Sequence, residues 1–184
     1  MQGFFFIGLQ GAGKGAQGML LKRLGFKQLV ASEALEAAPN DLKHEITSYV
    51  SAGQLVPDEI TVRALTDYLE DRTTPSDNIV LDGYMRTPGQ AEAMLVYLEE
   101  LGYDITVFVL VLPDAIALKR ALDRGRPDDT EDKLKVRFQG YYDHIGSVLA
   151  TVVRRGYSIH TVDTSGAAEQ IHEKICRIAK LDKG

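Results

Sequence analysis

The sequence has one cysteine and no tryptophan among its 184 residues, and it contains no long apolar run. A single cysteine, Cys176, excludes an internal disulfide and a four-cysteine metal site, and it favours a reducing compartment. No stretch approaches the roughly 20 apolar residues that a membrane-spanning helix needs. The apolar segment 4–7 is too short for the core of a secretion signal, and no basic residue precedes it. We therefore expect a cytoplasmic protein without a membrane partner.

Positive charge is also scarce. The chain carries 21 Lys and Arg against 26 Asp and Glu, which gives a formal net charge of −5. This balance excludes a general attraction for nucleic acid, so any anion site must be a local concentration of cationic groups. The hydrophobic content of 45% and the length are ordinary for one globular domain. The acidic balance, together with the lack of an obvious exposed apolar helix face, favours a monomer.

Short apolar runs alternate with longer helical patterns along the chain. The sequence predicts strands at 4–9, 28–31, 78–82, 105–112 and 157–162. It predicts helices at 13–24, 42–52, 58–71, 88–101, 114–124, 131–155 and 167–181. In the first helix we expect Met19, Leu20, Leu21 and Leu24 to face inward. Continuous apolar strands separated by helices predict an α/β fold, with a five-stranded parallel sheet covered by helices on both faces.

Two segments fit this alternation poorly. Residues 32–60 have helical patterns without a strand, and residues 123–130 are polar. Ligands bind at the carboxyl edge of such sheets, and both segments are typical of insertions over that edge. We therefore expect the functional site to lie beneath them.

The segment GLQGAGKGAQ, residues 8–17, stands between the first predicted strand and the first predicted helix. It satisfies the phosphate-loop pattern G-x-x-x-x-G-K-[ST] at every position except the last. The alternative is a glycine-rich turn without a ligand. Glycines let backbone N–H groups point at phosphate oxygens, and Lys14 would place its charge on the transferring phosphate. The predicted phosphate cradle consists of Gly8, Gly11, Ala12, Gly13, Lys14, Gly15 and Ala16.

Asp82 ends the predicted strand 78–82. A carboxylate at the carboxyl end of a strand beside a phosphate loop can hold Mg²⁺, often through water. A lone aspartate at this place could instead cap the strand end. We predict that Asp82 holds Mg²⁺ through water.

Four segments, in this order, resemble those of adenylate kinase and the wider nucleoside monophosphate kinase family. They are GLQGAGKGAQ, GQLVPDE (53–59), LDGYMRTPGQAEAM (81–94) and RPDDTEDKLKVRF (126–138). The resemblance covers essentially the whole chain and implies one P-loop kinase domain over 1–184. It implies an acceptor-binding lobe at 31–60 and a lid at 123–131 that is too short for a zinc-binding insertion. The implied activity is transfer of a phosphoryl group from ATP, with Mg²⁺, to a nucleoside monophosphate, AMP being the expected acceptor.

The resemblance also implies roles for individual residues. Arg86 would grip the acceptor phosphate next to Gly83, Gln90 would bond the acceptor base, and Gln54 and Val56 would line its pocket through backbone groups. Arginines suit such sites because their planar guanidinium groups bind phosphate oxygens in pairs and stay charged. Arg120 and Arg124 match donor-side arginines, and Arg126 and Arg137 match the lid pair that clamps the transferring group. The implied catalytic set is Lys14, Arg86, Arg120, Arg126 and Arg137.

Two departures from the family pattern are mild. Ala16 stands where the family has threonine, and the lost hydroxyl is worth about 1–2 kcal/mol as a hydrogen bond to a charged acceptor. Met85 replaces a proline before Arg86, which removes a backbone constraint but no charge. We therefore expect weakened donor binding rather than none.

Two departures in the acceptor lobe are more serious. Where the family has threonine and arginine, this chain has Ala31 and Glu36. If Glu36 faced a phosphate about 4 Å away, the repulsion would reach several kcal/mol at an effective dielectric near 20. The side chain could instead extend into solvent. In both cases one of two acceptor-phosphate arginines is missing.

Three hypotheses follow. The first is a kinase of adenylate kinase type that transfers phosphate from ATP to AMP. The second keeps the enzyme but changes the acceptor, because Ala31 and Glu36 favour a less anionic or differently shaped partner. The third is a nucleotide-binding protein that has lost transfer and acts by partner contact.

Overall fold

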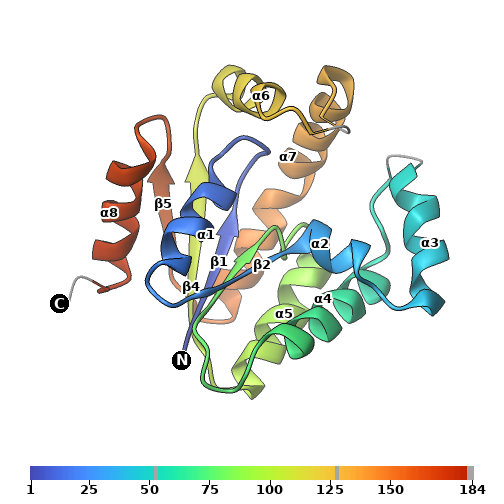
Figure 1. Ribbon diagram of the computed structural model, residues 1–184, viewed down its shortest axis with the longest axis horizontal. Helices are drawn as coiled ribbons and strands as arrows, with labels where there is room; N and C mark the ends of the chain where they lie inside the picture. The colour runs from blue at the N-terminus through green and yellow to red at the C-terminus, as the bar shows by residue number, and fades with distance from the viewer. Residues whose placement is uncertain (52–53, 127–128, 182–184) are drawn as a thin grey trace.

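The computed structural model describes residues 1–51, 54–126 and 129–181 (Figure 1). Its strands are β1 (Gln2–Ile7), β2 (Lys27–Val30), β3 (Ile79–Asp82), β4 (Asp104–Val111) and β5 (Ile159–Asp163). The helices are α1 (Lys14–Lys22), α2 (Ala31–Glu36), α3 (Asn40–Ser51), α4 (Asp58–Arg72), α5 (Pro88–Glu100), α6 (Asp114–Asp123), α7 (Glu131–Arg154) and α8 (Ala168–Ile178). No helix within these ranges is long and apolar enough to cross a membrane.

The predicted five-stranded parallel sheet is confirmed. Its strand order is β2-β3-β1-β4-β5, and every neighbouring pair is parallel. The strand β1 lies in the middle, between β3 and β4. The chain therefore steps to one side of β1 for β2 and β3 and to the other side for β4 and β5. Such a change of direction opens a crevice at the carboxyl end of β1, which is where ligands bind in sheets of this kind.

Helices cover both faces of the sheet (Figure 1). Alternate side chains of a strand point to opposite faces, and β1 is apolar at each position from Phe4 to Phe6. Phe5 packs in the cluster that includes residues of α4, α5 and α7. Phe4 and Phe6 pack in the other cluster, which includes residues of α1 and α8. The middle strand is thus buried on both faces, and the loop that leaves it starts from the centre of the sheet.

The predicted inward face of the first helix is partly wrong. Leu21 is fully buried, but Met19 is 65% exposed and Leu24 is 50% exposed. The buried face of α1 is formed by Leu21 with Gln17 and Gly18. At Gly18 an added Cβ would lie 2.3 Å from Nε2 of Gln28 in β2, so a larger residue there would require the Gln28 side chain to move. The apolar pattern thus identified only Leu21 among the buried positions of this helix.

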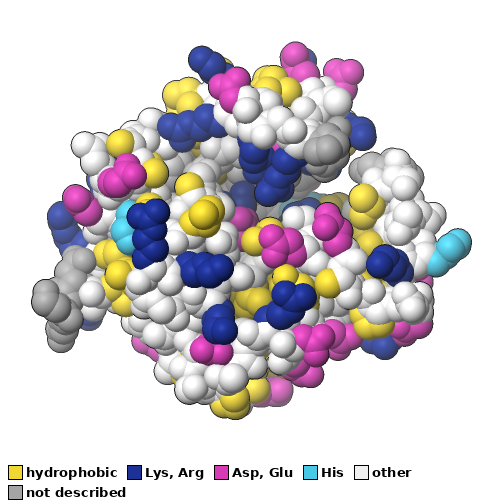
Figure 2. All heavy atoms as spheres, viewed as in Figure 1, with side chains coloured by type: hydrophobic (Ala, Val, Ile, Leu, Met, Phe, Trp, Pro, Cys, Tyr) yellow, Lys and Arg dark blue, Asp and Glu magenta, His cyan; other side chains and the backbone are white. Residues whose placement is uncertain are grey.

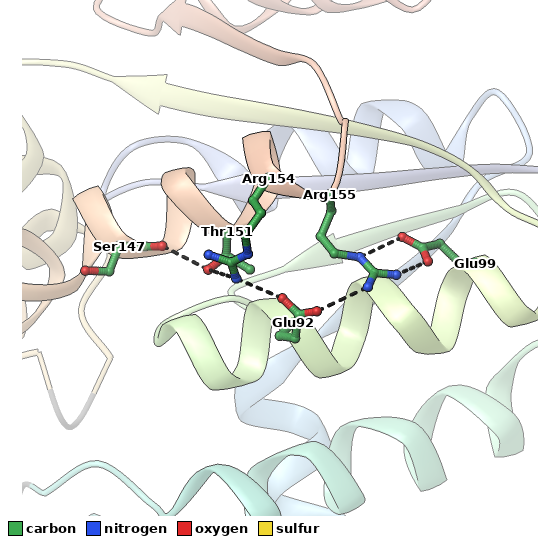
Figure 3. Close-up of polar contacts among 6 residues, drawn as sticks. All are labelled: Glu92, Glu99, Ser147, Thr151, Arg154 and Arg155. Carbon is green, nitrogen blue, oxygen red and sulfur yellow. Dashed lines mark hydrogen bonds and ion pairs between the residues drawn. The ribbon is translucent and has the colours of Figure 1, made fainter.

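A network of ion pairs joins α5 to the end of α7 (Figure 3). Arg155 forms ion pairs with Glu99 and with Glu92, the second at 3.2 Å, and Arg154 contacts Glu92 at 3.0 Å. The Arg155 guanidinium holds the pKa of Glu99 below its usual range, and the hydroxyl of Tyr157 also donates to Glu99. Since these groups are partly exposed, solvent screens each pair and its contribution to stability is small. Together they fix the far end of the helix that begins beside the predicted lid.

Candidate active site

The loop between β1 and α1 depends on two glycines with left-handed backbone. Gly11 has φ 86° and Gly13 has φ 85°, values that favour glycine. At Gly11 an added Cβ would lie 2.1 Å from the carbonyl oxygen of Ala117, so the loop rests directly on α6. The predicted strand, glycine loop and helix are therefore present in the order that a phosphate cradle requires.

Lys14 is the first residue of α1, and its side chain folds back over the loop. The Nζ atom donates to the carbonyl oxygens of Gly8 and Leu9, each at 2.9 Å, and lies 4.0 Å from Oδ1 of Asp82. The Lys14 side chain is 14% exposed. Lys14 therefore places a largely buried positive charge at the mouth of the glycine loop.

The charges of several other side chains act on the Lys14 ammonium. Burial lowers the pKa of Lys14, the Asp82 carboxylate opposes this, and the positive charges of Arg86, Arg124 and Arg126 lower the pKa further. These arginines come from the segment after β3 and from the segment after α6. Figure 2 shows a hollow between the part that contains α6 and the lobe that contains α3, with Lys and Arg side chains along its upper side.

Asp82 is the last residue of β3 and pairs in register with Phe6 of β1. This pairing brings its carboxylate to the loop: Oδ2 would lie 3.8 Å from a Cβ added at Gly15. Mg²⁺ prefers oxygen ligands and is commonly held by one or two carboxylates together with water and substrate phosphates. One strand-end carboxylate beside a phosphate loop fits that requirement, so the residues present are compatible with the predicted metal.

Arg86 follows β3 at the other side of the crevice. Its Nε donates to the carbonyl oxygen of Gly83 at 3.3 Å, and its backbone N–H donates to Oε1 of Gln90 at 3.0 Å. A Cβ added at Gly83 would lie 3.4 Å from Nη2 of Arg86 and 3.7 Å from Cβ of Ala31, so these three residues lie together. Burial lowers the pKa of Arg86, and the negative charge of Asp82 opposes this shift. The Arg86 guanidinium nevertheless stays charged, as arginine does in proteins.

The remaining predicted acceptor residues have contacts within the protein. Gln90 is 2% exposed, and its Nε2 donates to Asp58. The carbonyl oxygen of Val56 accepts from the hydroxyl of Thr61 at 3.2 Å, while Gln54 is exposed. The predicted contacts of these groups with an acceptor base stay predictions.

The two substituted positions of the acceptor lobe differ in burial. Ala31 is 3% exposed and begins α2, whereas Glu36 is exposed at the end of the same helix. The solvent-facing alternative for Glu36 therefore agrees with this structure. The predicted acceptor lobe 31–60 and the predicted lid 123–131 include residues 52–53 and 127–128, which lie outside the described residues.

A pocket of about 230 Å³ adjoins the glycine loop, and half of its lining residues were not predicted from the sequence. Arg120 contributes to it and donates to the carbonyl oxygens of Thr164 at 2.7 Å and Ser165 at 3.0 Å. The pocket is lined by Gly11, Ala12, Gly13, Ala16, Gln17, Arg120, Thr164, Gly166, Ala168 and Ile171. The polar segment 163–166, which follows the last predicted strand, was the sequence feature that could have indicated this part of the pocket. The pocket lies directly beside the glycine loop, three of whose residues line it: Gly11, Ala12 and Gly13.

Two of the predicted arginines meet on one buried carboxylate. Asp129, whose side chain is 1% exposed, accepts from Arg124 at 2.7 Å and from Arg137 at 3.3 Å. Arg126, which lies close to Asp129 in the sequence, is exposed to solvent. Asp129 was not among the predicted site residues, although it lies in the segment RPDDTEDKLKVRF.

Comparisons with known proteins agree with this geometry. The family model described as adenylate kinase matches residues 6–156. The chain is 33% identical to an adenylate kinase from Synechococcus sp. (strain CC9902), over 94% of this chain and 96% of the relative. It is 34% identical to an adenylate kinase from Deinococcus radiodurans, over 92% of each chain, and 34% identical to one from Mycobacterium leprae, over 90% and 92%. The chain therefore belongs to the adenylate kinase family and is an ATP-dependent phosphotransferase.

Proposed function

We propose that the protein catalyses reversible phosphoryl transfer from MgATP to AMP, which yields two molecules of ADP. The observation that carries this proposal is the position of Lys14, whose Nζ lies over the glycine loop and 4.0 Å from Asp82. The positive charges of Arg86, Arg124 and Arg126 act on it there and lower its pKa. Phosphoryl transfer needs reactants in line and positive charge spread over the transferring group, not a covalent catalyst. A buried lysine beside a glycine loop, with arginines whose charge reaches it, supplies the positive charge that this reaction needs.

On the donor side, the backbone N–H groups of the loop and the Lys14 ammonium would hold the phosphates of ATP. Asp82 would hold Mg²⁺ through water, and the bound ion would neutralise charge on the donor phosphates. The pocket lined by Gln17 and Arg120 would take the base and ribose. Ala16 contributes no hydroxyl, so the loop binds through amides and one lysine.

On the acceptor side, Arg86 would bind the phosphate of AMP. Its guanidinium is solvent-accessible and bonded to Gly83, so it is oriented before the ligand arrives. The segment from Gln54 to Val56 would contact the base through backbone groups. Since Glu36 replaces the second arginine of the family pattern, Arg86 carries the acceptor phosphate without that partner.

The lid arginines would complete the site when it closes. In this structure Arg124 and Arg137 are held by Asp129, and phosphate oxygens would compete for the same guanidinium groups. Closure would also exclude water, which otherwise would accept the phosphate from ATP. We further propose a cytoplasmic monomer whose partners are these small nucleotides, and sedimentation of the purified protein tests the monomer.

The direct test mixes the protein with MgATP and each nucleoside monophosphate in turn and follows diphosphate formation by chromatography. We expect AMP to be the best acceptor. Lys14→Met serves as the negative control, because it removes the donor-phosphate charge. No diphosphate with any acceptor would refute the proposal.

A changed acceptor is the second candidate, and the acceptor lobe supports it. Ala31 is buried against Gly83 and Glu36 offers a negative charge, so this side of the site is less cationic than the family pattern. A panel that includes unphosphorylated nucleosides would reveal such an acceptor, and a clear preference for AMP would exclude it. If calorimetry showed ATP binding while turnover was undetectable, a nucleotide-binding protein without transfer would be favoured instead.

A further inference from the structure

Asp58 joins two parts of the acceptor site that are distant in sequence. It is the first residue of α4 and directly follows the segment that contains Val56. Its carboxylate reaches the start of α5, where Oδ1 accepts from the hydroxyl of Thr87 at 2.7 Å and from Nε2 of Gln90 at 3.1 Å. One carboxylate oxygen therefore ties the beginning of α4 to the beginning of α5.

The start of α5 is shaped to receive this carboxylate. At Gly89 an added Cβ would lie 2.2 Å from Oδ2 of Asp58, so a larger residue there would require the carboxylate to move. Thr87 also accepts from the backbone N–H of Gln90 at 3.1 Å and so caps the helix. A negative charge at a helix N-terminus is favourable. The glycine, the cap and the charge together hold Asp58 in one place.

Asp58 determines which way the Gln90 amide points. A carboxylate accepts hydrogen bonds, so it must face the NH₂ end of the amide. The carbonyl end then faces the backbone N–H of Arg86, at 3.0 Å. If the Gln90 amide were reversed, its NH₂ group would face the N–H of Arg86 and its carbonyl oxygen would face the Asp58 carboxylate. Gln90 is 2% exposed, so water could not replace the two lost hydrogen bonds.

We propose that Asp58 is a positioning residue of the acceptor site, which through Gln90 holds the backbone of Arg86 in register with the segment 54–57. The kinetic consequence rests on the proposed function, since it requires that Arg86 bind an acceptor phosphate. With Glu36 in place of a second arginine, the placement of Arg86 decides acceptor binding. Gln90 then serves this site by orienting Arg86.

The kinetic test compares Asp58→Ala, Asp58→Asn and the matched control Glu59→Ala. Glu59 is the next residue of the same helix turn, carries the same charge and is exposed. We expect Asp58→Ala to raise the KM for AMP roughly ten- to hundredfold and to leave the KM for ATP unchanged. Asp58→Asn keeps an acceptor oxygen and should recover most of the loss. An equal rise of both KM values, or no rise for AMP, would overturn the proposal.

A second measurement does not depend on turnover. In the intact protein the N–H of Arg86 donates to Gln90, so its amide hydrogen should exchange slowly with solvent. We expect Asp58→Ala to speed this exchange by roughly tenfold or more, as followed by NMR, and Glu59→Ala to leave it unchanged. If the wild-type protein formed no diphosphate, the proposed function would be refuted. The exchange rate of the Arg86 amide would still test whether Asp58 positions Arg86. Equal exchange in Asp58→Ala and wild type would contradict this positioning role.

Discussion

Arg124 donates two hydrogen bonds to one carboxylate oxygen of Asp129, from Nη2 at 2.7 Å and from Nε at 3.2 Å. The other oxygen accepts from Arg137 at 3.3 Å. The carboxylate is almost completely buried, whereas the two guanidinium groups keep about a third of their surface. One buried negative charge therefore holds together two cations that would otherwise repel each other.

Replacing Asp129 by alanine should destabilise the protein. The change leaves two neighbouring cations without their shared counter-charge, and we expect a loss of about 1–3 kcal/mol, since both arginines can still reach water. Urea unfolding measures it. Asp143→Ala is the control, because Asp143 is exposed on α7, the helix that carries Arg137. Equal losses in the two variants would show that the shared counter-charge contributes nothing.

The fold could be predicted because its central elements follow simple patterns. The strands β1 and β4 are continuous apolar runs, which indicate burial on both faces. The strand β5 gave a weaker signal because it lies at the sheet edge and only Val162 of its five residues is buried. The order of the strands could not be predicted, because an apolar pattern shows that a strand is buried but not which strand lies beside it.

Gly11 should tolerate alanine much less well than Gly102, although both have left-handed backbone. A Cβ at Gly11 would collide with the carbonyl oxygen of Ala117, whereas nothing lies within 4 Å of one at Gly102. We expect Gly102→Ala to cost about 1–2 kcal/mol from backbone strain. Gly11→Ala should cost at least about 3 kcal/mol, because the loop must also move away from α6. Thermal or urea unfolding measures the loss of stability in each variant. Equal losses would mean that the loop moves away from α6 at no cost in free energy.

Activity should fall at alkaline pH earlier than an ordinary lysine would predict. Burial lowers the pKa of Lys14, so the free enzyme loses the ammonium proton below the usual range for lysine. The neutral amine cannot balance donor-phosphate charge, and the value of kcat/KM for ATP should decline as pH rises through the lowered pKa. Lys14→Arg should retain its charge and shift the decline to higher pH, at lower activity. An unchanged alkaline decline in Lys14→Arg would assign it to another group.

The parts of the site that were not predicted arise from tertiary contacts. The pocket beside the glycine loop is lined both by Gln17 of α1 and by Thr164, which follows the last strand. Arg120 bonds a carbonyl oxygen 44 residues away, and no local spacing reports such a contact. The loop, by contrast, could be predicted because its glycines, its lysine and its place between strand and helix are consecutive in the sequence. Local motifs thus indicated the chemistry, and packing supplied the residues that position it.

Replacing Tyr84 by phenylalanine should stabilise the protein. Its hydroxyl is buried and makes no hydrogen bond among the described residues, and burial raises the pKa of the group, so the phenol stays neutral. Removing an unsatisfied hydroxyl should gain about 1 kcal/mol, which corresponds to a rise in Tm of about 2–4 °C at this chain length. In the control Tyr97→Phe, the lost hydroxyl donates to Glu70 at 2.7 Å, so stability should not increase. A lower Tm for Tyr84→Phe would show that the hydroxyl has a partner.

Replacing Glu36 by arginine tests whether the end of α2 faces the acceptor phosphate. The change replaces an exposed carboxylate with a hydrogen-bond donor long enough to turn toward the site, and a bond to a charged group is worth about 1.5–3 kcal/mol. We therefore expect the KM for AMP to fall by roughly tenfold or more while the KM for ATP stays constant. The family pattern has arginine at this position, and the exposed side chain leaves room for it.

Glu45→Arg is the control for Glu36→Arg, because it makes the same change of charge at an exposed position of α3, the helix that follows α2. A general electrostatic attraction would lower the KM for AMP in both variants, and added salt would remove the gain because exposed charges are screened. A direct contact would lower it in Glu36→Arg alone and would survive moderate salt. No change in either variant would mean that position 36 does not reach the acceptor phosphate, and the grip on AMP would then depend on Arg86 and on the residues that orient it.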